Sequence, residues 1–157
     1  MSKIDLRLGV ISDTHGLLRP QAIAALRGSD LIIHAGDVGN AVVLEGLGEI
    51  ARTFAIRGNV DKGAWAARLP STDIVEVGAL MFYVLHNIAE LDLDAPTAGF
   101  GAVVFGHSHR PSIETRDGVL YLNPGAAGPR RFNLPVTVAR VTVSGQELRP
   151  EIVELKV

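Results

Sequence analysis

The 157-residue chain contains no cysteine, one tryptophan and only two tyrosines. The absence of cysteine excludes disulfides, thiolate metal sites, iron–sulfur clusters and a cysteine nucleophile. It also fits a reducing compartment, so we expect a cytoplasmic protein. Apolar runs are short, and none approaches the roughly 20 residues needed to cross a bilayer. The N-terminus lacks the apolar core of a signal peptide, and we expect no membrane partner.

Neither sign of charge dominates the sequence, because 15 basic residues stand against 17 acidic ones and the formal net charge is −2. A protein whose main task is to hold a nucleic-acid backbone normally carries a basic stripe, so we expect no long nucleic acid as partner. The hydrophobic fraction of 47% supports a globular chain. Its length is that of one ordinary domain, and we expect a single domain over residues 1–157.

The first half of the chain alternates apolar, β-branched segments with segments of helical character. We expect strands at 6–12, 30–34 and 53–56, and helices at 21–26 and 41–50. Proline at position 20 suits the first turn of the first helix. This alternation predicts parallel strands that are joined by right-handed crossovers.

The second half contains mostly strands, several of which are joined by glycine-containing hairpin signals. The expected strands are 72–77, 80–85, 102–105, 112–115, 119–122, 136–143 and 147–155. These are too many strands for one compact sheet in a chain of this length. We therefore expect an α/β fold with two facing mixed sheets and the helices outside.

Polar residues follow five of the expected strands directly. The five clusters are Asp13-Thr14-His15, Gly36-Asp37, Gly58-Asn59, His86-Asn87 and Gly106-His107-Ser108-His109. Ligands of open α/β sheets gather beyond the carboxyl ends of the strands, so these clusters can meet at one place. The glycines allow sharp backbone turns beneath a crowded site.

Carboxylate, amide and imidazole donors together suit manganese, iron, zinc or nickel better than calcium. Seven candidates exceed the need of one ion, and a shared aspartate would allow two ions about 3.5–4 Å apart. Each cluster alone has a simpler explanation. Asp13 could cap a helix, Gly36-Asp37 and Gly58-Asn59 could be turns, and His86 could be a hydrogen-bonded core histidine. The metal hypothesis depends on all five clusters occurring together.

The complete pattern resembles the calcineurin-like metallophosphoesterase superfamily, and specifically its small single-domain bacterial and archaeal phosphodiesterases. Asp-x-His, Gly-Asp, Gly-Asn, a lone histidine and Gly-His-x-His occur in this order between Asp13 and His109. The flanking segments 11–16, 104–109 and 122–125 fit as well. The resemblance spans nearly the whole chain and implies a four-layer α/β/β/α sandwich with a dinuclear metal centre.

Carried over motif by motif, the resemblance implies a role for each cluster. Asp13, His15 and His109 would hold one divalent ion; Asn59, His86 and His107 would hold the second; Asp37 would bridge them. Manganese is the first expectation, with iron, zinc or nickel as alternatives. A hydroxide between the ions would attack the phosphorus of a small phosphate diester, which makes Asp37, Asn59 and His86 the expected catalytic residues.

Two positions depart from the family pattern. Many members have histidine after Gly-Asn, where it is thought to protonate the leaving group, whereas this chain has Val60 followed by Asp61. Valine cannot donate a proton, so we expect a preference for good leaving groups, or help from Asp61 or a water. A turn residue or a helix cap is the simpler interpretation of Asp61. After His86, many relatives continue with Gly-His, and this chain has Asn87-Ile88.

Several further residues have open roles. Asn59, Arg110 and Arg130 are the expected substrate contacts, with Arg131 as another candidate, although arginines are commonly ordinary surface residues. His34 could orient Asp37 or simply fill the core. The Asn123-Pro124-Gly125 segment could place backbone amides near the site or form a plain turn. Trp65 and Phe132 could stack on a base, but packing in the core or at an interface is the simpler interpretation.

Three other functions compete with a phosphodiesterase. The chain could be a phosphomonoesterase, or a non-catalytic metal-binding scaffold like the retromer subunit of the same fold. The full set of competent ligands argues against the scaffold. A nuclease acting on long substrates is disfavoured by the charge balance. The C-terminal hairpins could also pair across a homo-oligomer.

Overall fold

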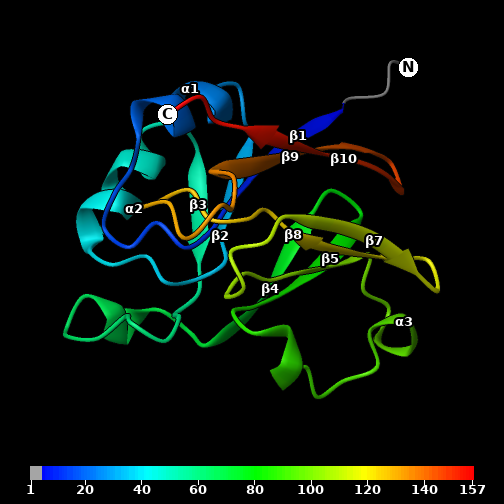
Figure 1. Ribbon diagram of the computed structural model, residues 1–157. Coiled ribbons are helices and arrows are strands. Elements are labelled where there is room, and N and C mark those ends of the chain that lie inside the picture. Colours follow the sequence, from blue (N-terminus) through cyan, green and yellow to red (C-terminus); the bar gives the residue numbers. More distant parts are fainter. Residues whose placement is uncertain (1–4) are drawn as a thin grey trace.

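The computed structural model describes residues 5–157, which form two five-stranded mixed sheets with strand orders β10-β9-β1-β2-β3 and β4-β5-β6-β8-β7 (Figure 1). The first sheet contains β1 (Leu6–Ile11), β2 (Leu31–His34), β3 (Arg52–Ala55), β9 (Thr137–Ser144) and β10 (Glu147–Glu154). The second contains β4 (Thr72–Val77), β5 (Leu80–Leu85), β6 (Ala102–Val104), β7 (Ser112–Arg116) and β8 (Val119–Asn123). The expected α/β fold with two facing mixed sheets is confirmed.

Helices cover the outer faces of the two sheets unequally. The helices α1 (Pro20–Leu26) and α2 (Ala41–Gly48) pack on the first sheet, and the 3₁₀ turn η1 (Ala66–Arg68) follows β3. The outer face of the second sheet is covered by the short η2 (Ile88–Glu90) and α3 (Ala95–Ala98). These short elements were absent from the sequence-based expectation. Proline at Pro96 and a left-handed C-cap at Gly99 limit α3 to one turn.

The core lies between the sheets because alternate side chains of each strand point to opposite faces. Ile33 of β2 packs with Phe82 of β5 in the central cluster. Its neighbour Ile32 packs under α1 and α2 instead, and Tyr83 points to the outer cluster beneath α3. Burial on both faces explains why the β2 and β6 segments are continuously apolar in the sequence.

Parallel pairing brings the carboxyl ends of the site-bearing strands to common edges. In the first sheet, Ile11 is paired with His34, and His34 with Ala55. In the second, Val84 is paired with Val104 and Val104 with Leu122. The predicted parallel β1-β2-β3 arrangement is therefore confirmed, and the loops that follow each set of strands start side by side.

Strand and helix boundaries agree with expectation to within one or two residues. The largest difference is α2, which ends at Gly48 although helical spacing predicted a helix to residue 50. Among residues 5–157, no helix is long and apolar enough to span a membrane.

Candidate metal centre

Backbone hydrogen bonds bind the site loops to one another. The N–H of Asp13 donates to Gly36 O at 3.0 Å, and the N–H of His15 donates to Asp37 O at 3.0 Å. The loops after β1 and β2 are thereby joined as if the parallel pairing continued. In the second sheet, Gly106 N–H donates to His86 O at 2.9 Å. The metal-ligand candidates are held in place by main-chain contacts as well as by strand ends.

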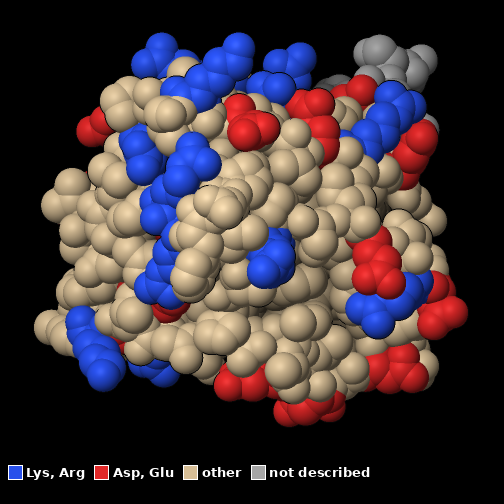
Figure 2. Space-filling model, viewed as in Figure 1, with Lys and Arg blue, Asp and Glu red and all other residues tan. Residues whose placement is uncertain are grey.

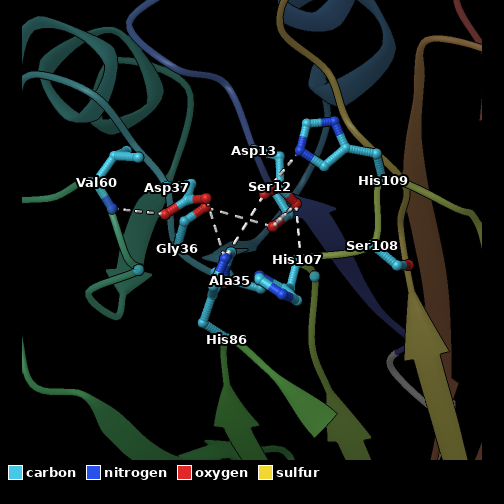
Figure 3. A network of polar contacts seen from close by, with 12 residues as sticks. Ser12, Asp13, Ala35, Gly36, Asp37, Val60, His86, His107, Ser108 and His109 are labelled. Carbon is cyan, nitrogen blue, oxygen red and sulfur yellow. Dashed lines mark hydrogen bonds and ion pairs between the residues drawn. The ribbon is translucent and has the colours of Figure 1, made fainter. Parts of the chain in front are cut away.

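Side-chain atoms from four loops converge on a small volume (Figure 3). Asp13 Oδ1 lies 3.9 Å from His15 Nε2, 3.8 Å from His86 Nε2 and 3.4 Å from His109 Nε2. Asp37 Oδ2 lies 3.7 Å from His15 Nε2 and 3.1 Å from His86 Nε2. Two overlapping groups result, namely Asp13 with His15 and His109, and Asp13 with Asp37 and His86. Each group offers one oxygen-rich and imidazole-rich site for a cation.

Several side-chain atoms that face this volume are buried and have no hydrogen-bond partner. Within residues 5–157, Asp13 Oδ1, His15 Nε2 and His86 Nε2 have no hydrogen-bond partner. The 3.1 Å approach of His86 Nε2 to Asp37 Oδ2 also lacks hydrogen-bond alignment. An unpaired buried polar atom costs about 1–3 kcal/mol, so several in one place require a ligand. A divalent cation fits this set of carboxylate and imidazole donors.

The remaining atoms of the same side chains are firmly held. Asp13 Oδ2 accepts from Ser12 Oγ at 2.8 Å and from His107 N–H at 3.2 Å. Asp37 Oδ1 accepts from Val60 N–H at 3.1 Å. His86 Nδ1 lies 2.7 Å from Ala35 O, so in the neutral imidazole Nδ1 carries the proton and Nε2 keeps its lone pair. This arrangement fixes which atom of each residue faces the centre, as the outer contacts of metal ligands do.

Backbone strain is concentrated in these loops. Asp13, His15, Asp37, His107 and His109 all have positive φ, with values of 55°, 47°, 55°, 72° and 64°. The left-handed region costs a residue with a side chain roughly 1–2 kcal/mol. Such strain is commonly found at functional sites, and five strained residues around one volume make that volume the candidate functional site.

Two glycines are required by close packing beneath the ligands. A Cβ at Gly58 would lie 2.2 Å from Asp37 N, and a Cβ at Gly106 would lie 2.1 Å from Ser12 Oγ. Both distances are far below van der Waals contact, and the atoms in the way belong to the ligand loops themselves. Gly58 and Gly106 are therefore needed for close approach, whereas a backbone turn that favours glycine is found at Gly36, whose φ is 99°.

The protonation states of two ligand candidates depend on one another. Burial by itself raises the pKa of Asp37, but nearby His86 and the Val60 N–H outweigh burial and lower that pKa to about 2. Burial likewise disfavours the charged imidazole of His86, yet Asp37 and the Ala35 carbonyl raise its pKa above the ordinary value. The carboxylate is thus ionised and available to a cation.

Asp61 joins the loops that follow β2 and β3, a role that the sequence did not settle. Its carboxylate is 3% exposed and accepts from three backbone amides: Val38 N–H at 3.1 Å, Gly39 N–H at 2.9 Å and Gly58 N–H at 2.9 Å. These bonds support the turn-residue interpretation over a catalytic one. The three-residue offset from Gly58 to Asp61 is a turn signal, but it could not reveal the bonds to residues 38 and 39.

Asn123 and His34 hold the site loops in place through hydrogen bonds to their neighbours. Asn123 Nδ2 donates to Gly106 O at 3.1 Å and to Ser108 Oγ at 3.1 Å, and its Oδ1 accepts from Gly125 N–H at 2.9 Å. It therefore supports the histidine-bearing loop through its side chain rather than through backbone amides aimed at the site. His34 is fully buried, and its ring bonds to Gly36 and Thr14 rather than to Asp37.

The remaining predicted residues lie around the centre at different depths. The His107 ring packs edge-on against His86 at 5.3 Å between centroids, and Asn59 and His86 both line a hollow at the rim. Arg110 is exposed and adjoins His109, whereas Arg130 donates to Leu134 O at 3.3 Å and lines a depression with the C-terminal residues 154–157.

The two aromatic candidates differ in burial. Trp65 is partly buried against the helix-side core. Phe132 is 90% exposed, so it is not part of the core, and its packing at an interface stays a prediction.

Charge is unevenly spread over the visible face. Figure 2 shows Lys and Arg side chains gathered at the top, over α1, and in a band to the left of centre. Asp and Glu side chains lie along the lower and right edges and also beside the basic side chains at the top.

Comparison with known proteins identifies the family of this chain. A sequence profile of the calcineurin-like phosphoesterase superfamily domain matches residues 6–146. A "probable metallophosphoesterase" of Methanocaldococcus jannaschii is 33% identical over 132 residues, which are 76% of this chain and 67% of that protein. This chain belongs to the calcineurin-like phosphoesterase superfamily.

Two solved structures show how widely the fold is shared. An archaeal phosphodiesterase superposes with a TM-score of 0.79 at 23% identity, over 94% of this chain and all of that one (100%). Vacuolar protein sorting 29 of Cryptosporidium parvum superposes with a TM-score of 0.78 at 16% identity, over 98% and 99% of the two chains. At these identities the likeness shows the fold alone.

Proposed function

We propose that this protein is a metal-dependent phosphodiesterase that hydrolyses small phosphate diesters. The observation that carries the proposal is the convergence of Asp13 Oδ1, His15 Nε2 and His86 Nε2, all buried and unpaired within residues 5–157. Membership of a phosphoesterase superfamily supplies the reaction class. A phosphate-ester substrate offers the anionic oxygens that a cation in this centre attracts.

We assign Asp13, His15 and His109 to one divalent ion, and Asn59, His86 and His107 to a second. Asp37 is shared between them, which its short distances to both His15 and His86 support. The mixed oxygen and nitrogen donors favour manganese, with iron, zinc or nickel as alternatives. When bound, these ions polarise the phosphoryl oxygens and lower the pKa of an attacking water.

The chain's own residues hold the metal-ligand candidates in place, but neither Val60 nor Asp61 supplies a proton to the leaving group. Asp37 and His86 hold fixed orientations through Val60 N–H and Ala35 O, and Asn59 and Arg110 are proposed to contact the phosphate, with Arg130 as a more distant candidate. Neither Val60 nor Asp61 can protonate a leaving alcohol, because Val60 is apolar and Asp61 is committed to three amides. Diesters of acidic alcohols are therefore the preferred substrates.

A chromogenic diester and a chromogenic monoester, assayed after chelation and after addition of manganese, test this proposal. Asp37→Asn removes the shared carboxylate, and Asp117→Asn is a matched control because Asp117 has a similar φ of 50° in the exposed β7–β8 turn. We expect manganese-dependent diester turnover that Asp37→Asn reduces by at least about 10²-fold. The control should retain full activity.

Two outcomes would change the assignment. Turnover of the monoester alone would make the protein a phosphomonoesterase. Metal binding without turnover of either ester would favour a metal-binding scaffold, an alternative that the fold shared with vacuolar protein sorting 29 keeps relevant.

A further inference from the structure

A hollow of about 490 Å³ opens directly beside the candidate metal centre. Asn59 and His86 form its inner wall, Ser71 and Thr72 at the start of β4 form another side, and Glu90 and Asp92 lie on the segment after η2. Ligand pockets for small molecules commonly fall in the range of roughly 300–1,000 Å³. A group bonded to a phosphate at the centre can thus extend into this hollow.

The wall that carries the acidic residues is built by the sequence after His86. The Asn87 side chain accepts from Ala89 N–H at 3.0 Å and caps η2, whose last residue is Glu90. Figure 2 shows acidic side chains gathered along the lower edge of the molecule, where this segment runs in Figure 1. Asn87, which departs from the family pattern, thus starts the turn that carries Glu90, and both residues line the hollow together with Asp92.

The charged groups of the hollow have free hydrogen-bonding capacity. Arg57, Glu90 and Asp92 are exposed, and within residues 5–157 their side chains form no ion pair with one another or with other groups. Tyr83 lines the same hollow and is held by its ring contact with Phe100 at 5.3 Å. Polar groups of this kind can bind a ligand without first breaking an internal bond.

The composition of the lining defines the ligand. Carboxylates accept hydrogen bonds from sugar-type hydroxyls, as acidic residues do for the ribose of dinucleotides, and the hydroxyls of Ser71 and Thr72 can both donate and accept. One arginine against two carboxylates leaves an excess of negative charge, which disfavours a second phosphate. An aromatic or alkyl group would displace water from these polar groups without replacing its hydrogen bonds.

We propose that this hollow binds the alcohol part of a diester that carries vicinal hydroxyls, such as a glyceryl or ribosyl group without further phosphates. The proposal rests on the proposed phosphodiesterase function and extends it to a substrate class. Glu90 and Asp92 determine specificity by accepting hydrogen bonds from the two hydroxyls.

A matched pair of substrates tests the specificity. Glyceryl 4-nitrophenyl phosphate and propyl 4-nitrophenyl phosphate share their leaving group and differ only in the two hydroxyls. Two hydrogen bonds of ordinary strength predict a roughly tenfold higher kcat/KM for the glyceryl ester, mostly through KM. In the double variant Glu90→Ala with Asp92→Ala, which removes both acceptors, this ratio should fall towards one. Glu114→Ala, at an exposed carboxylate on the edge strand β7, is the control and should leave the ratio unaltered.

Binding measured by calorimetry with manganese present separates this proposal from the proposed function. Glycerol 1-phosphate should bind roughly tenfold more tightly than propyl phosphate, and the double variant should remove the difference. Equal affinities, or a difference that the double variant retains, would overturn the hydroxyl site even in an active enzyme. Absence of turnover with a retained binding difference would overturn the phosphodiesterase function and leave the site standing.

Discussion

His86 and Asp37 come from different sheets, yet His86 Nε2 lies 3.1 Å from Asp37 Oδ2. Each residue is held from behind by a backbone group, Ala35 O for His86 and Val60 N–H for Asp37. The two sheets are thus connected at their carboxyl ends through the candidate metal centre. A cation bound there stabilises the sandwich as well as enabling chemistry, because a ligand that binds only the folded chain stabilises it.

Divalent cations should raise the melting temperature of the chelated protein. At a free manganese concentration of about 100 Kd, binding contributes roughly 2.7 kcal/mol, which corresponds to a shift of about 5–10 °C for a chain of this size. Differential scanning calorimetry with and without chelator measures it. An unchanged melting temperature would contradict a metal centre shared by both sheets.

His109→Gln should reduce the number of bound ions from two to one. His109 belongs to the group with Asp13 and His15, and it is not part of the group with Asp37 and His86. Elemental analysis of protein dialysed against manganese gives the stoichiometry, with Asp117→Asn as control. Two ions retained by the variant would disprove the proposed division of ligands.

Asp61→Ala should destabilise the fold by at least about 2 kcal/mol, because it leaves the N–H groups of Val38, Gly39 and Gly58 without their acceptor. Urea unfolding of the chelated protein measures this loss independently of metal. Asp61→Asn should be destabilising too, since its amide NH₂ faces backbone donors. A loss below about 0.5 kcal/mol in the alanine variant, the scale of an ordinary surface substitution, would show that Asp61 does not hold the loops together.

Gly58→Ala should abolish metal binding, because its Cβ would meet Asp37 N at 2.2 Å and Asp37 Oδ1 at 2.3 Å. Gly48→Ala is the matched control. Gly48 ends α2 and has nothing within 4 Å of the added carbon, so its substitution should be neutral or stabilising by up to about 1 kcal/mol. Calorimetric manganese titration of both variants makes the comparison. Wild-type affinity in Gly58→Ala would refute the close-packing argument.

His34 should make the chelated protein less stable in mild acid. Burial lowers the pKa of His34 from 6.5 to about 4, so between these values the unfolded chain binds a proton that the folded chain does not. This contribution to stability is present above pH 6.5 and is lost as the pH falls towards 4. Its full size is on the order of 3 kcal/mol.

The His34→Gln variant isolates this effect, because all other titrating groups are common to both proteins. Urea unfolding at pH 7 and near the folded-state pKa of about 4 gives the two free energies of unfolding. The variant should be less stable at neutral pH, because it loses the ring's bonds to Gly36 and Thr14. On acidification it should lose less stability than the unsubstituted protein. Equal losses in both proteins would contradict a neutral, buried His34.

Local sequence patterns determined the strands, the two main helices and the clusters at strand ends. The ligand candidates between Asp13 and His109 could be proposed because they follow apolar runs. The apolar run predicts a strand, and the aspartate or histidine after it supplies a metal ligand at the end of that strand. The short η2 and α3 escaped notice, since one turn of helix has too few residues for a periodic signal. Phe132 was expected to pack in the core or at an interface, and its exposure of 90% places it outside the core. The sequence could not decide between the two, because burial depends on which segments surround a loop.

The sequence by itself determined which donor types the candidate centre contains, because the identity and order of these residues are read directly along the chain. The tertiary structure decided which atoms of those donors meet, and it revealed the contacts that hold them. Asp61 bonds to amides 22 and 23 residues away, and Asn123 supports Gly106 from 17 residues away. Such contacts depend on how the strands are placed beside one another. The sum of many weak packing energies decides that placement, and no local spacing of residues encodes it.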